Sequence, residues 1–331
     1  MQMNEQRNDF LRTISIGVLL PILLVCVVVL MGQTNAADLQ DQTQTTQPTA
    51  GEQVQMQLTV LFGEEEEIMD LETYLLGVVL GEMPASFELD ALRAQSVAAR
   101  TYTLKKCLEG ARHGENTICT DHTCCQAYTD PTSYVTSGGS ETSVERVRQA
   151  VEDTAGQVLV YDGELIMATY FSCAGGITED AVAVWGQEYP YLQSVPSPGE
   201  EDAAYYTDSK TFTAEQFQKA LGIRLEGRVD KWFGKVVYTD GGGVETLTIC
   251  GIPYRGTTLR TLLGLRSTAF TVTVINGKIT FQTKGYGHRV GMSQYGANAM
   301  AKRGKDYREI LTHYYTGTEI VQYSDEQTNL E

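Results

Sequence analysis

An uncharged stretch near the N-terminus constrains this 331-residue chain more than any other feature. Ile14 to Gln33 contains no Asp, Glu, Lys or Arg, and a transmembrane helix needs about 20 apolar residues. We therefore predict a single transmembrane anchor over residues 13–33. A cleaved signal peptide is the alternative, because residues 34–36 (TNA) resemble a cleavage site, although the apolar stretch is long for that role.

The charges on either side of this segment predict its orientation. Arg7 and Arg12 precede it, whereas the next basic residue after it is Arg93, and twelve Asp and Glu lie in between. By the positive-inside rule, residues 1–12 form a cytoplasmic stub and the rest of the chain lies outside the cell membrane. Residues 34–53 are polar and low in complexity, which predicts a flexible linker to an extracytoplasmic domain over 54–331.

The overall charge excludes two classes of partner. The chain has a formal net charge of -17 at pH 7. Nucleic-acid binding requires clusters of Lys and Arg that neutralise phosphates. Docking on anionic lipid also requires basic clusters. We therefore expect neither activity.

Mixed helix and strand signals without a regular βαβ alternation predict an α+β fold, with helices and β-hairpins around a substrate cleft. Apolar residues at helical spacing predict helices over 69–82 and 89–110, and the run GEEEE (63–67) is typical of a solvated loop. Asp-Gly and Asn-Gly pairs predict hairpin turns. Further strands, hairpins and short helices are expected at 54–62, 156–171, 212–222, 234–249, 271–283, 293–304 and 306–317.

Glu82 is the leading catalytic candidate. It lies between an apolar run and Pro84, at the expected C-terminus of a helix, where the helix dipole disfavours a carboxylate. Burial and this dipole both raise the pKa of a carboxyl group, as a general acid requires. The alternative is a structural ion pair between Glu82 and Arg93 or Arg100.

A cluster of cysteine and histidine follows at 113–128 (HGENTICTDHTCCQAY). Extracytoplasmic cysteines usually form disulfides, but adjacent cysteines are awkward to pair. His113, Cys119, Cys124 and Cys125 would instead give the Cys₃His set of a closed structural zinc site. A catalytic metal is not expected, because no Glu is placed as in an HExxH motif.

Three blocks of sequence together resemble the SpoIID family, the stage II sporulation protein D family. They are VVLGEMPASFELDALRAQSVAARTY (78–102), TYFSCAGGITE (169–179) and GYGHRVGMSQYGANAMAKRG (285–304). The resemblance covers nearly all of residues 54–322. It implies a membrane-anchored lytic transglycosylase that cleaves peptidoglycan during engulfment in sporulation. Its glycan substrate would be stripped of peptides, and its partners would be the amidase SpoIIP and the membrane protein SpoIIM.

The chemistry implied by this resemblance needs one carboxyl group. Glu82 would protonate the glycosidic oxygen and then take a proton from the C6 hydroxyl of muramic acid, which closes an anhydro ring without water. Related domains in amidase enhancers do not cut glycan, so a glycan-binding protein that assists an amidase is the alternative function. Detection of anhydro sugar ends separates the two.

The resemblance also suggests site residues. His113, Cys119 and Cys125 match zinc ligands of the family, with Cys124 or His122 as the fourth ligand. Arg100, Tyr170, Ser172, Cys173, Gly175, Gly176, His288 and Gln294 are the expected substrate-binding residues. For Cys173 a small core residue or a disulfide partner is an alternative, and for His288 a structural role. The family usually has glycine where this chain has Arg289.

Overall fold

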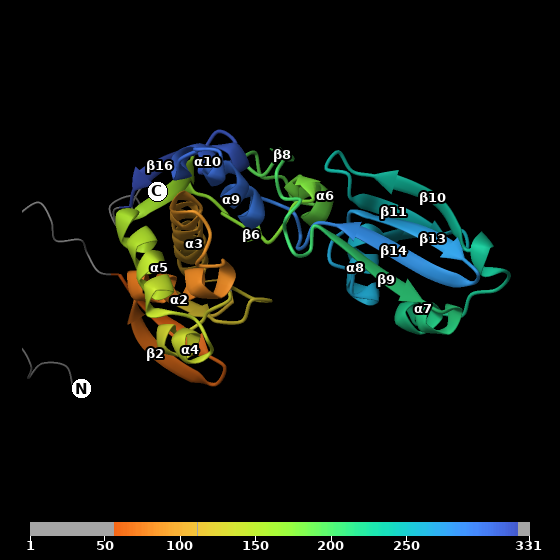
Figure 1. Cartoon of the computed structure of the whole chain (residues 1–331), viewed down its shortest axis with the longest axis horizontal. Helices are drawn as coiled ribbons and strands as arrows, with labels where there is room; N and C mark the ends of the chain where they lie inside the picture. Colours follow the sequence, from red (N-terminus) through yellow and green to blue (C-terminus); the bar gives the residue numbers. More distant parts are fainter. Residues whose placement is uncertain (1–55, 111, 324–331) are drawn as a thin grey trace, which may run out of the picture. The chain divides into compact units, whose positions relative to one another are not determined.

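The computed structural model describes residues 56–110 and 112–323. The predicted cytoplasmic stub, transmembrane anchor and linker (1–53) lie outside the described residues and stay predictions. Within the described part, no helix is long and apolar enough to cross a membrane. The observed mixture of helices and small sheets confirms the α+β prediction for this part of the chain (Figure 1).

Two separate hydrophobic cores divide the described residues. One core is formed entirely by residues of 56–206 and 285–323, which we call the helical lobe. The other is formed by residues between Phe212 and Phe281, and we call residues 207–284 the β-lobe. The β-lobe is an insertion whose two ends meet, because Thr207 pairs with Lys284 and the Gly285 amide donates to the Tyr206 carbonyl at 2.9 Å.

The helical lobe is built around α3 (Leu89–Glu109). Ala91, Ala94 and Ala98 on this helix are fully buried, and these small side chains let neighbouring elements approach closely. The elements that contact α3 include α2 (Leu71–Glu82), α5 (Glu141–Asp153), α9 (Gln294–Lys302), α10 (Tyr307–Tyr314) and β4 (Gln157–Tyr161).

The small sheets of the helical lobe tie together segments that are distant in sequence. β1 (Gln57–Phe62) pairs with β2 (Glu65–Asp70) and β3 (Thr117–Cys119), and β4 pairs with β5 (Glu164–Leu165) and β16 (Glu319–Gln322). Most important for the site, β6 (Tyr170–Phe171) runs parallel to β15 (Met292–Ser293). This pairing places the second and third sequence blocks side by side. The remaining elements of the lobe are α4 (Pro131–Thr136), α6 (Ala181–Trp185), β7 (Gly176–Ile177) and β8 (Pro196–Ser197).

The β-lobe contains two three-stranded sheets, ordered β13-β14-β9 and β10-β11-β12. Its aromatic core packs α7 (Ala214–Leu221) and α8 (Gly256–Leu263) against these strands. The strands are β9 (Thr207–Phe212), β10 (Phe233–Tyr238), β11 (Val244–Ile249), β12 (Ile252–Arg255), β13 (Phe270–Ile275) and β14 (Lys278–Lys284), with a short 3₁₀ turn η1 (Val229–Lys231).

Most of the predicted elements are confirmed, and one is corrected. α3 ends at Gly110 in the left-handed conformation, and Thr213 and Gln216 form the capping box of α7. The acidic run at 63–67 was expected to be a loop, but most of it belongs to strand β2. Pairing with β1 supplies its backbone hydrogen bonds, and its side chains stay in water, so the charge does not prevent a strand.

Candidate active site

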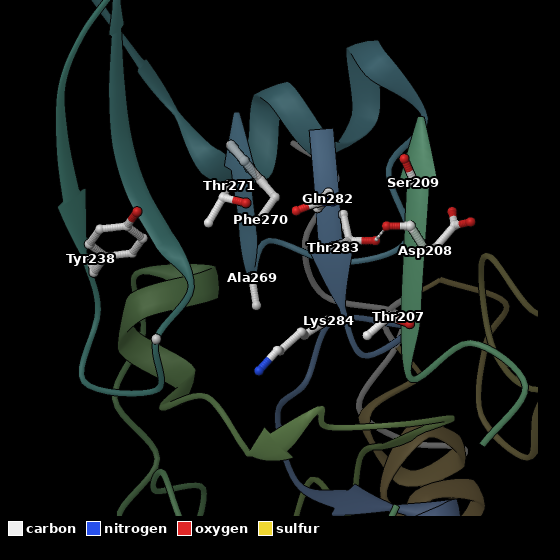
Figure 2. A pocket seen from close by; sticks show the side chains of 11 residues that line it. Thr207, Asp208, Ser209, Tyr238, Ala269, Phe270, Thr271, Gln282, Thr283 and Lys284 are labelled. Atoms are coloured by element: carbon white, nitrogen blue, oxygen red, sulfur yellow. Dashed lines mark hydrogen bonds between the residues drawn. The ribbon is translucent and has the colours of Figure 1, made fainter. Parts of the chain in front are cut away.

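Two cavities of similar size lie in different parts of the molecule. One, of about 780 Å³, lies in the β-lobe and is lined mainly by hydroxyl and amide side chains such as Ser209, Thr271 and Gln282 (Figure 2). The other, of about 770 Å³, contains Glu82. Since this second cavity also collects residues of all three sequence blocks, we take it as the candidate site and call it the Glu82 pocket. Its lining is Gly81, Glu82, Tyr102, His122, Thr123, Cys124, Cys125, Thr169, Tyr170, Phe171, Ser172, Trp185, Arg260, Tyr286, Gly287, His288 and Gln294.

Glu82 is the last residue of α2, and Met83 continues in extended conformation. One carboxylate oxygen, Oε1, accepts a hydrogen bond of 2.7 Å from the backbone amide of Ala127. Gly81 favours this contact, because a Cβ at that position would lie only 3.0 Å from the Tyr128 amide nitrogen and 3.1 Å from the Ala127 carbonyl carbon. The glycine before the glutamate therefore lets the 126–128 segment pass close enough to hold the carboxyl group.

The surroundings of Glu82 favour its protonated form. Burial is the largest effect and raises the pKa of Glu82 above its ordinary value of 4.5. The Ala127 amide, the Gln294 side chain and His122 lower the pKa by smaller amounts. The buried Nε2 of Gln294 lies near the carboxyl group without a hydrogen bond of normal geometry to any described residue.

The alternative of a structural ion pair at Glu82 is wrong for both proposed partners. Arg93 pairs with Asp90 and Asp153. Arg100 pairs with Glu72 through two hydrogen bonds, from Nε at 2.8 Å and Nη2 at 2.6 Å. Arg100 is also fully buried and does not line the Glu82 pocket, so its predicted contact with substrate is corrected to a structural role beneath α2.

The SCAGG loop (172–176) folds around a carboxylate that the sequence did not reveal. Glu200 is 1% exposed and accepts hydrogen bonds from the backbone amides of Ala174, Gly175 and Gly176. The expectation that Gly175 and Gly176 bind the substrate is therefore corrected, because their amides already donate to Glu200 and neither residue lines the Glu82 pocket. Cys173 is buried with its Sγ 3.6 Å from Glu200, which agrees with the alternative of a small core residue.

The other predicted substrate-binding residues do reach the Glu82 pocket. Tyr170, Ser172, His288 and Gln294 all line it. The Tyr170 hydroxyl donates to Gln126 Oε1 at 2.7 Å, which fixes the ring against the 126–128 segment. Ser293 caps α9 by accepting from the Gly296 amide, and this cap positions Gln294 at the first turn.

His288 holds the pocket wall together as a neutral imidazole. Its Nδ1 accepts from the Val290 amide at 3.2 Å, so Nε2 carries the proton and donates to the Tyr170 carbonyl at 3.1 Å. Burial lowers the pKa of His288 to about 4, with a further contribution from the nearby charge of Arg260. Its ring packs against Phe171 and Trp185. No described contact joins His288 to Glu82, so it does not orient the acid directly.

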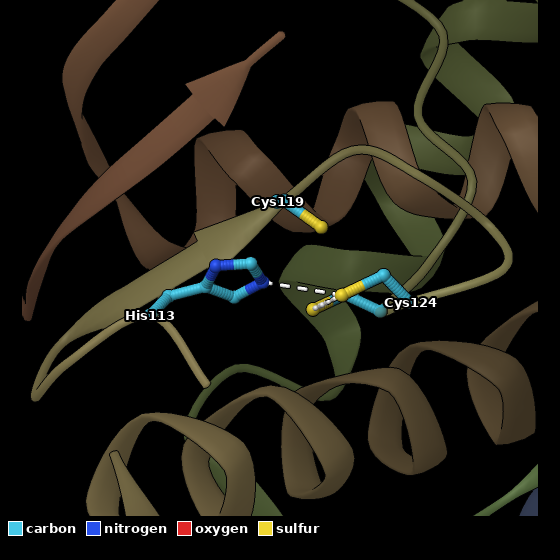
Figure 3. A group of neighbouring side chains, drawn as sticks. His113, Cys119 and Cys124 are labelled. Atoms are coloured by element: carbon cyan, nitrogen blue, oxygen red, sulfur yellow. Dashed lines mark hydrogen bonds between the residues drawn. The ribbon is translucent and has the colours of Figure 1, made fainter. Parts of the chain in front are cut away.

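The predicted zinc ligands converge at one edge of the pocket. The ligand atoms of His113, Cys119, Cys124 and Cys125 all lie within 4.8 Å of one another (Figure 3). The His113 Nε2 to Cys124 Sγ distance is 3.2 Å, and the Cys124 to Cys125 Sγ distance is 3.7 Å. Two thiolates on a tetrahedral zinc lie about 3.8 Å apart, so the residues fit this metal. The reserve ligand His122 has a side chain that is 78% exposed and lies outside the cluster.

Comparison with known proteins identifies the family. The SpoIID family model, described as stage II sporulation protein, matches residues 64–161. The chain is 39% identical over 259 residues to stage II sporulation protein D of Bacillus subtilis (strain 168), covering 77% of this chain and 75% of that protein. The chain belongs to the SpoIID family. The protein of the same name from Bacillus amyloliquefaciens is 38% identical over 258 residues, with the same coverage of both chains.

A further relative widens the range of activities in this sequence group. The protein named amidase enhancer from Bacillus subtilis (strain 168) is 32% identical over 306 residues, covering 75% of this chain and 40% of that protein. The family model ends at residue 161, before the second and third sequence blocks. The SpoIID relatives extend over much more of the chain.

At Arg289, where the family resemblance led us to expect glycine, the backbone has the conformation that glycine favours, with φ of 67°. The Arg289 guanidinium is buried, pairs with Glu179 at 3.0 Å and donates to the carbonyls of Ala174, Ile177 and Gly241. Gly241 belongs to the β10–β11 turn. These four bonds connect that turn of the β-lobe to the SCAGG loop and to the segment that follows it.

Several pocket residues of this SpoIID member were missed by sequence reasoning. Tyr102 follows Arg100 on α3, Trp185 ends α6, and Arg260 comes from α8 of the β-lobe. Trp185 is 42% exposed in the structure, and an exposed aromatic ring is a typical sugar-stacking surface. Arg260 lies far from all three blocks in sequence, so only the fold brings it to the pocket.

Proposed function

We propose that this chain is a peptidoglycan lytic transglycosylase in which Glu82 acts first as general acid and then as general base. One observation carries the proposal: among the described residues that line the pocket, Glu82 is the only carboxylic acid. A glycosidase that uses water or a covalent intermediate ordinarily needs two carboxyl groups. A single acid agrees with a reaction in which the substrate supplies its own nucleophile.

The protonated Glu82 donates its proton to the oxygen that links C1 of muramic acid to C4 of the next glucosamine. The C1–O bond breaks, and the glucosamine leaves as an alcohol. The resulting carboxylate takes the proton of the muramic C6 hydroxyl as O6 bonds to C1. Glu82 is thereby restored to its acid form, and no water is consumed. A pKa raised by burial supports the first step, since the acid must hold its proton near neutral pH.

Other pocket residues have supporting roles. Trp185 and Tyr286 offer ring surfaces for sugars. The Nε2 of Gln294, close enough to Glu82 to lower its pKa and without a hydrogen bond of normal geometry among the described residues, is available to a sugar oxygen. We assign a structural zinc to His113, Cys119, Cys124 and Cys125, where it would crosslink the loop whose continuation holds Glu82 through Ala127.

We also propose, from the family resemblance, that the domain is anchored to the cell membrane by residues 13–33 and acts outside it during engulfment. Peptide-stripped glycan is the proposed substrate, with the amidase SpoIIP and the membrane protein SpoIIM as partners. A non-catalytic role is the second candidate, favoured by the similarity to the relative named amidase enhancer.

Mass spectrometry of products tests the proposal. Purified residues 54–331, which contain all the described residues, are incubated with peptide-free glycan strands. The transglycosylase proposal expects fragments ending in 1,6-anhydromuramic acid. Fragments with reducing muramic ends would instead indicate hydrolysis. Intact strands, combined with faster release of stem peptides by an added amidase from peptide-bearing peptidoglycan, would support the amidase-enhancer alternative.

A further inference from the structure

Arg260 contributes an uncompensated positive charge to the Glu82 pocket. It lies on α8 of the β-lobe, whereas every other described residue that lines the pocket belongs to the helical lobe. No ion pair or hydrogen bond of its guanidinium is found among the described residues, and its Nε is buried without a partner. A half-buried guanidinium without an anion is unusual, because desolvating the charge costs free energy that a partner normally offsets.

The position of Arg260 in the pocket affects its own pKa and that of a neighbouring residue of the pocket. Burial lowers the pKa of Arg260, and the charge of Arg260 helps to lower the pKa of His288. Another arginine of the same lobe, Arg266, does have partners. Arg266 is stacked on Tyr205 and Tyr286, with 4.2 Å and 4.7 Å to the ring centres, and its Nε lies 3.7 Å from Asp208.

We propose that Arg260 binds a carboxylate of the substrate, namely the free lactyl carboxylate that muramic acid carries when its stem peptide is absent. This inference rests on the proposed function and names the residue that would select its substrate. The lactyl group is attached to C3 of the sugar whose C1–O bond would be cleaved, so the carboxylate lies within one ring of the scissile bond. A planar guanidinium matches a carboxylate with two parallel hydrogen bonds.

The same contact excludes a peptide-bearing strand. When a stem peptide is attached, the lactyl carboxyl group is an amide and carries no charge. Binding such a strand would desolvate Arg260 without supplying an anion, which is unfavourable. The pocket would therefore accept a glycan after an amidase has removed its stem peptides. This selectivity would come from Arg260 of the β-lobe, whereas Glu82, the proposed acid, belongs to the helical lobe.

Binding measurements with matched ligands test this inference independently of cleavage. Peptide-free glycan strands, cleared of phosphate polymers, are compared with the same strands after their lactyl carboxylates have been converted to carboxamides. Affinities are measured by calorimetry for the Glu82→Gln chain, which keeps the strands intact. We expect the free-acid strands to bind at least about tenfold more tightly, as a charge-assisted hydrogen bond implies.

Substitutions then assign the effect to one side chain. Adding Arg260→Gln should remove the preference for the free acid while leaving the melting temperature unchanged or higher, because no internal partner is lost. Arg260→Lys should retain part of the preference, since it keeps the positive charge but cannot form the two parallel hydrogen bonds of a guanidinium. Arg255→Gln removes an exposed arginine at the start of the same helix and should retain all of it.

The outcomes separate this inference from the proposed function. Equal affinity of the unsubstituted Arg260 chain for acid and amide strands, or an acid preference that survives Arg260→Gln, overturns the inference even if the wild-type chain forms anhydro ends. An acid preference abolished by Arg260→Gln supports it even if the wild-type chain cleaves nothing. A melting temperature that falls with Arg260→Gln identifies a structural residue and also overturns it.

Discussion

The two lobes of this molecule are stabilised by different means. The β-lobe has an aromatic core, with Phe217 stacked against Trp232 and Phe281. Among the described residues, the fully buried charged side chains Arg100, Glu179, Glu200 and Arg289 all belong to the helical lobe. Buried charges are costly unless they are paired and hydrogen-bonded, and each of these four has partners in the structure.

This difference has a functional meaning. Glu179, Glu200 and Arg289 hold short, irregular segments of the helical lobe in fixed positions beside the Glu82 pocket. Glu200 organises the SCAGG loop, and its hydrogen bond with Ser293 joins this loop to the start of α9. The β-lobe needs no such network, because its antiparallel strands satisfy their own backbone groups. It contributes Arg260 to the pocket from a rigid helix.

The largest expected effect lies at the acid of the helical lobe. Glu82→Gln keeps the acceptor for the Ala127 amide but cannot donate a proton, so release of anhydro-ended fragments should fall by about 10²–10⁴-fold. Glycan binding should persist. Glu215→Gln, which makes the same change at an exposed acid on α7 of the β-lobe, is the matched control and should leave the rate unchanged. A Glu82→Gln chain of near wild-type rate would refute the assignment.

Removal of the proposed zinc should lower the melting temperature of the helical lobe but not that of the β-lobe. Cys119→Ser, or a strong chelator, removes a ligand that converges with the others only in the folded chain, so the melting temperature of the helical lobe should fall by roughly 10 °C. Cys250→Ser changes an exposed cysteine of the β-lobe and should have no effect. Calorimetry and elemental analysis are the measurements, with about one zinc per chain expected.

Two results would contradict the zinc assignment. One is a metal-free protein of unchanged stability, and the other is peptide mapping that finds Cys119 in a disulfide. Loss of cleavage at constant stability would instead indicate a catalytic metal, with Glu82 in a supporting role.

The junction of the lobes should be the next most sensitive place. Glu179→Gln leaves the buried Arg289 without its counter-charge, and we expect a loss of about 3 kcal/mol in the free energy of unfolding by denaturant titration. Asp153→Asn breaks the partly exposed pair with Arg93 and should cost about 1 kcal/mol or less. Equal losses in the free energy of unfolding for the two variants would mean that the buried Arg289–Glu179 pair is no more important for stability than the partly exposed Arg93–Asp153 pair.

Local sequence patterns predicted many elements but not their long-range partners. The turn at Asn276 and Gly277 and the end of α3 depend on neighbouring residues, and both are confirmed. The partner of Arg100 depends on how α3 packs on α2, which no spacing reveals, so the sequence assigned this buried arginine to the substrate. The role of Glu200 was not predicted for the same reason. Its hydrogen-bond donors lie 24 to 26 residues away, in a loop that was expected to bind the substrate.

The convergence of His113, Cys119, Cys124 and Cys125 was predictable because these residues fall within 13 positions and their chemistry is distinctive. The Glu82 pocket was predictable in part. The three blocks that resemble the family contain Glu82, Tyr170, Ser172, His288 and Gln294. Arg260, by contrast, belongs to the inserted β-lobe. Its position depends on how residues 207–284 fold and return to Gly285.

The smallest expected effect concerns stability and pH at Glu82. Burial raises the pKa of Glu82 in the folded protein above the ordinary value of 4.5. Below that value the carboxyl group is protonated in both the folded and unfolded chains, so Glu82→Gln should leave stability nearly unchanged. As the pH rises above 4.5 and through the folded pKa, the folded wild type must either keep a proton that the unfolded chain releases or bury the carboxylate charge, so it loses stability that the glutamine variant keeps.

Glu82→Gln should therefore be more stable than the wild type at pH 7, by about 1 kcal/mol, a typical size for one substitution. The gap should narrow as the pH approaches 4. His288, whose pKa is lowered to about 4, destabilises both chains equally in acid and cancels in the difference. Denaturant titrations of both chains between pH 4 and 8 provide the measurement. A gap that widens on acidification would mean that the folded protein stabilises the ionised carboxylate, and Glu82 would then be unsuited to donate the first proton.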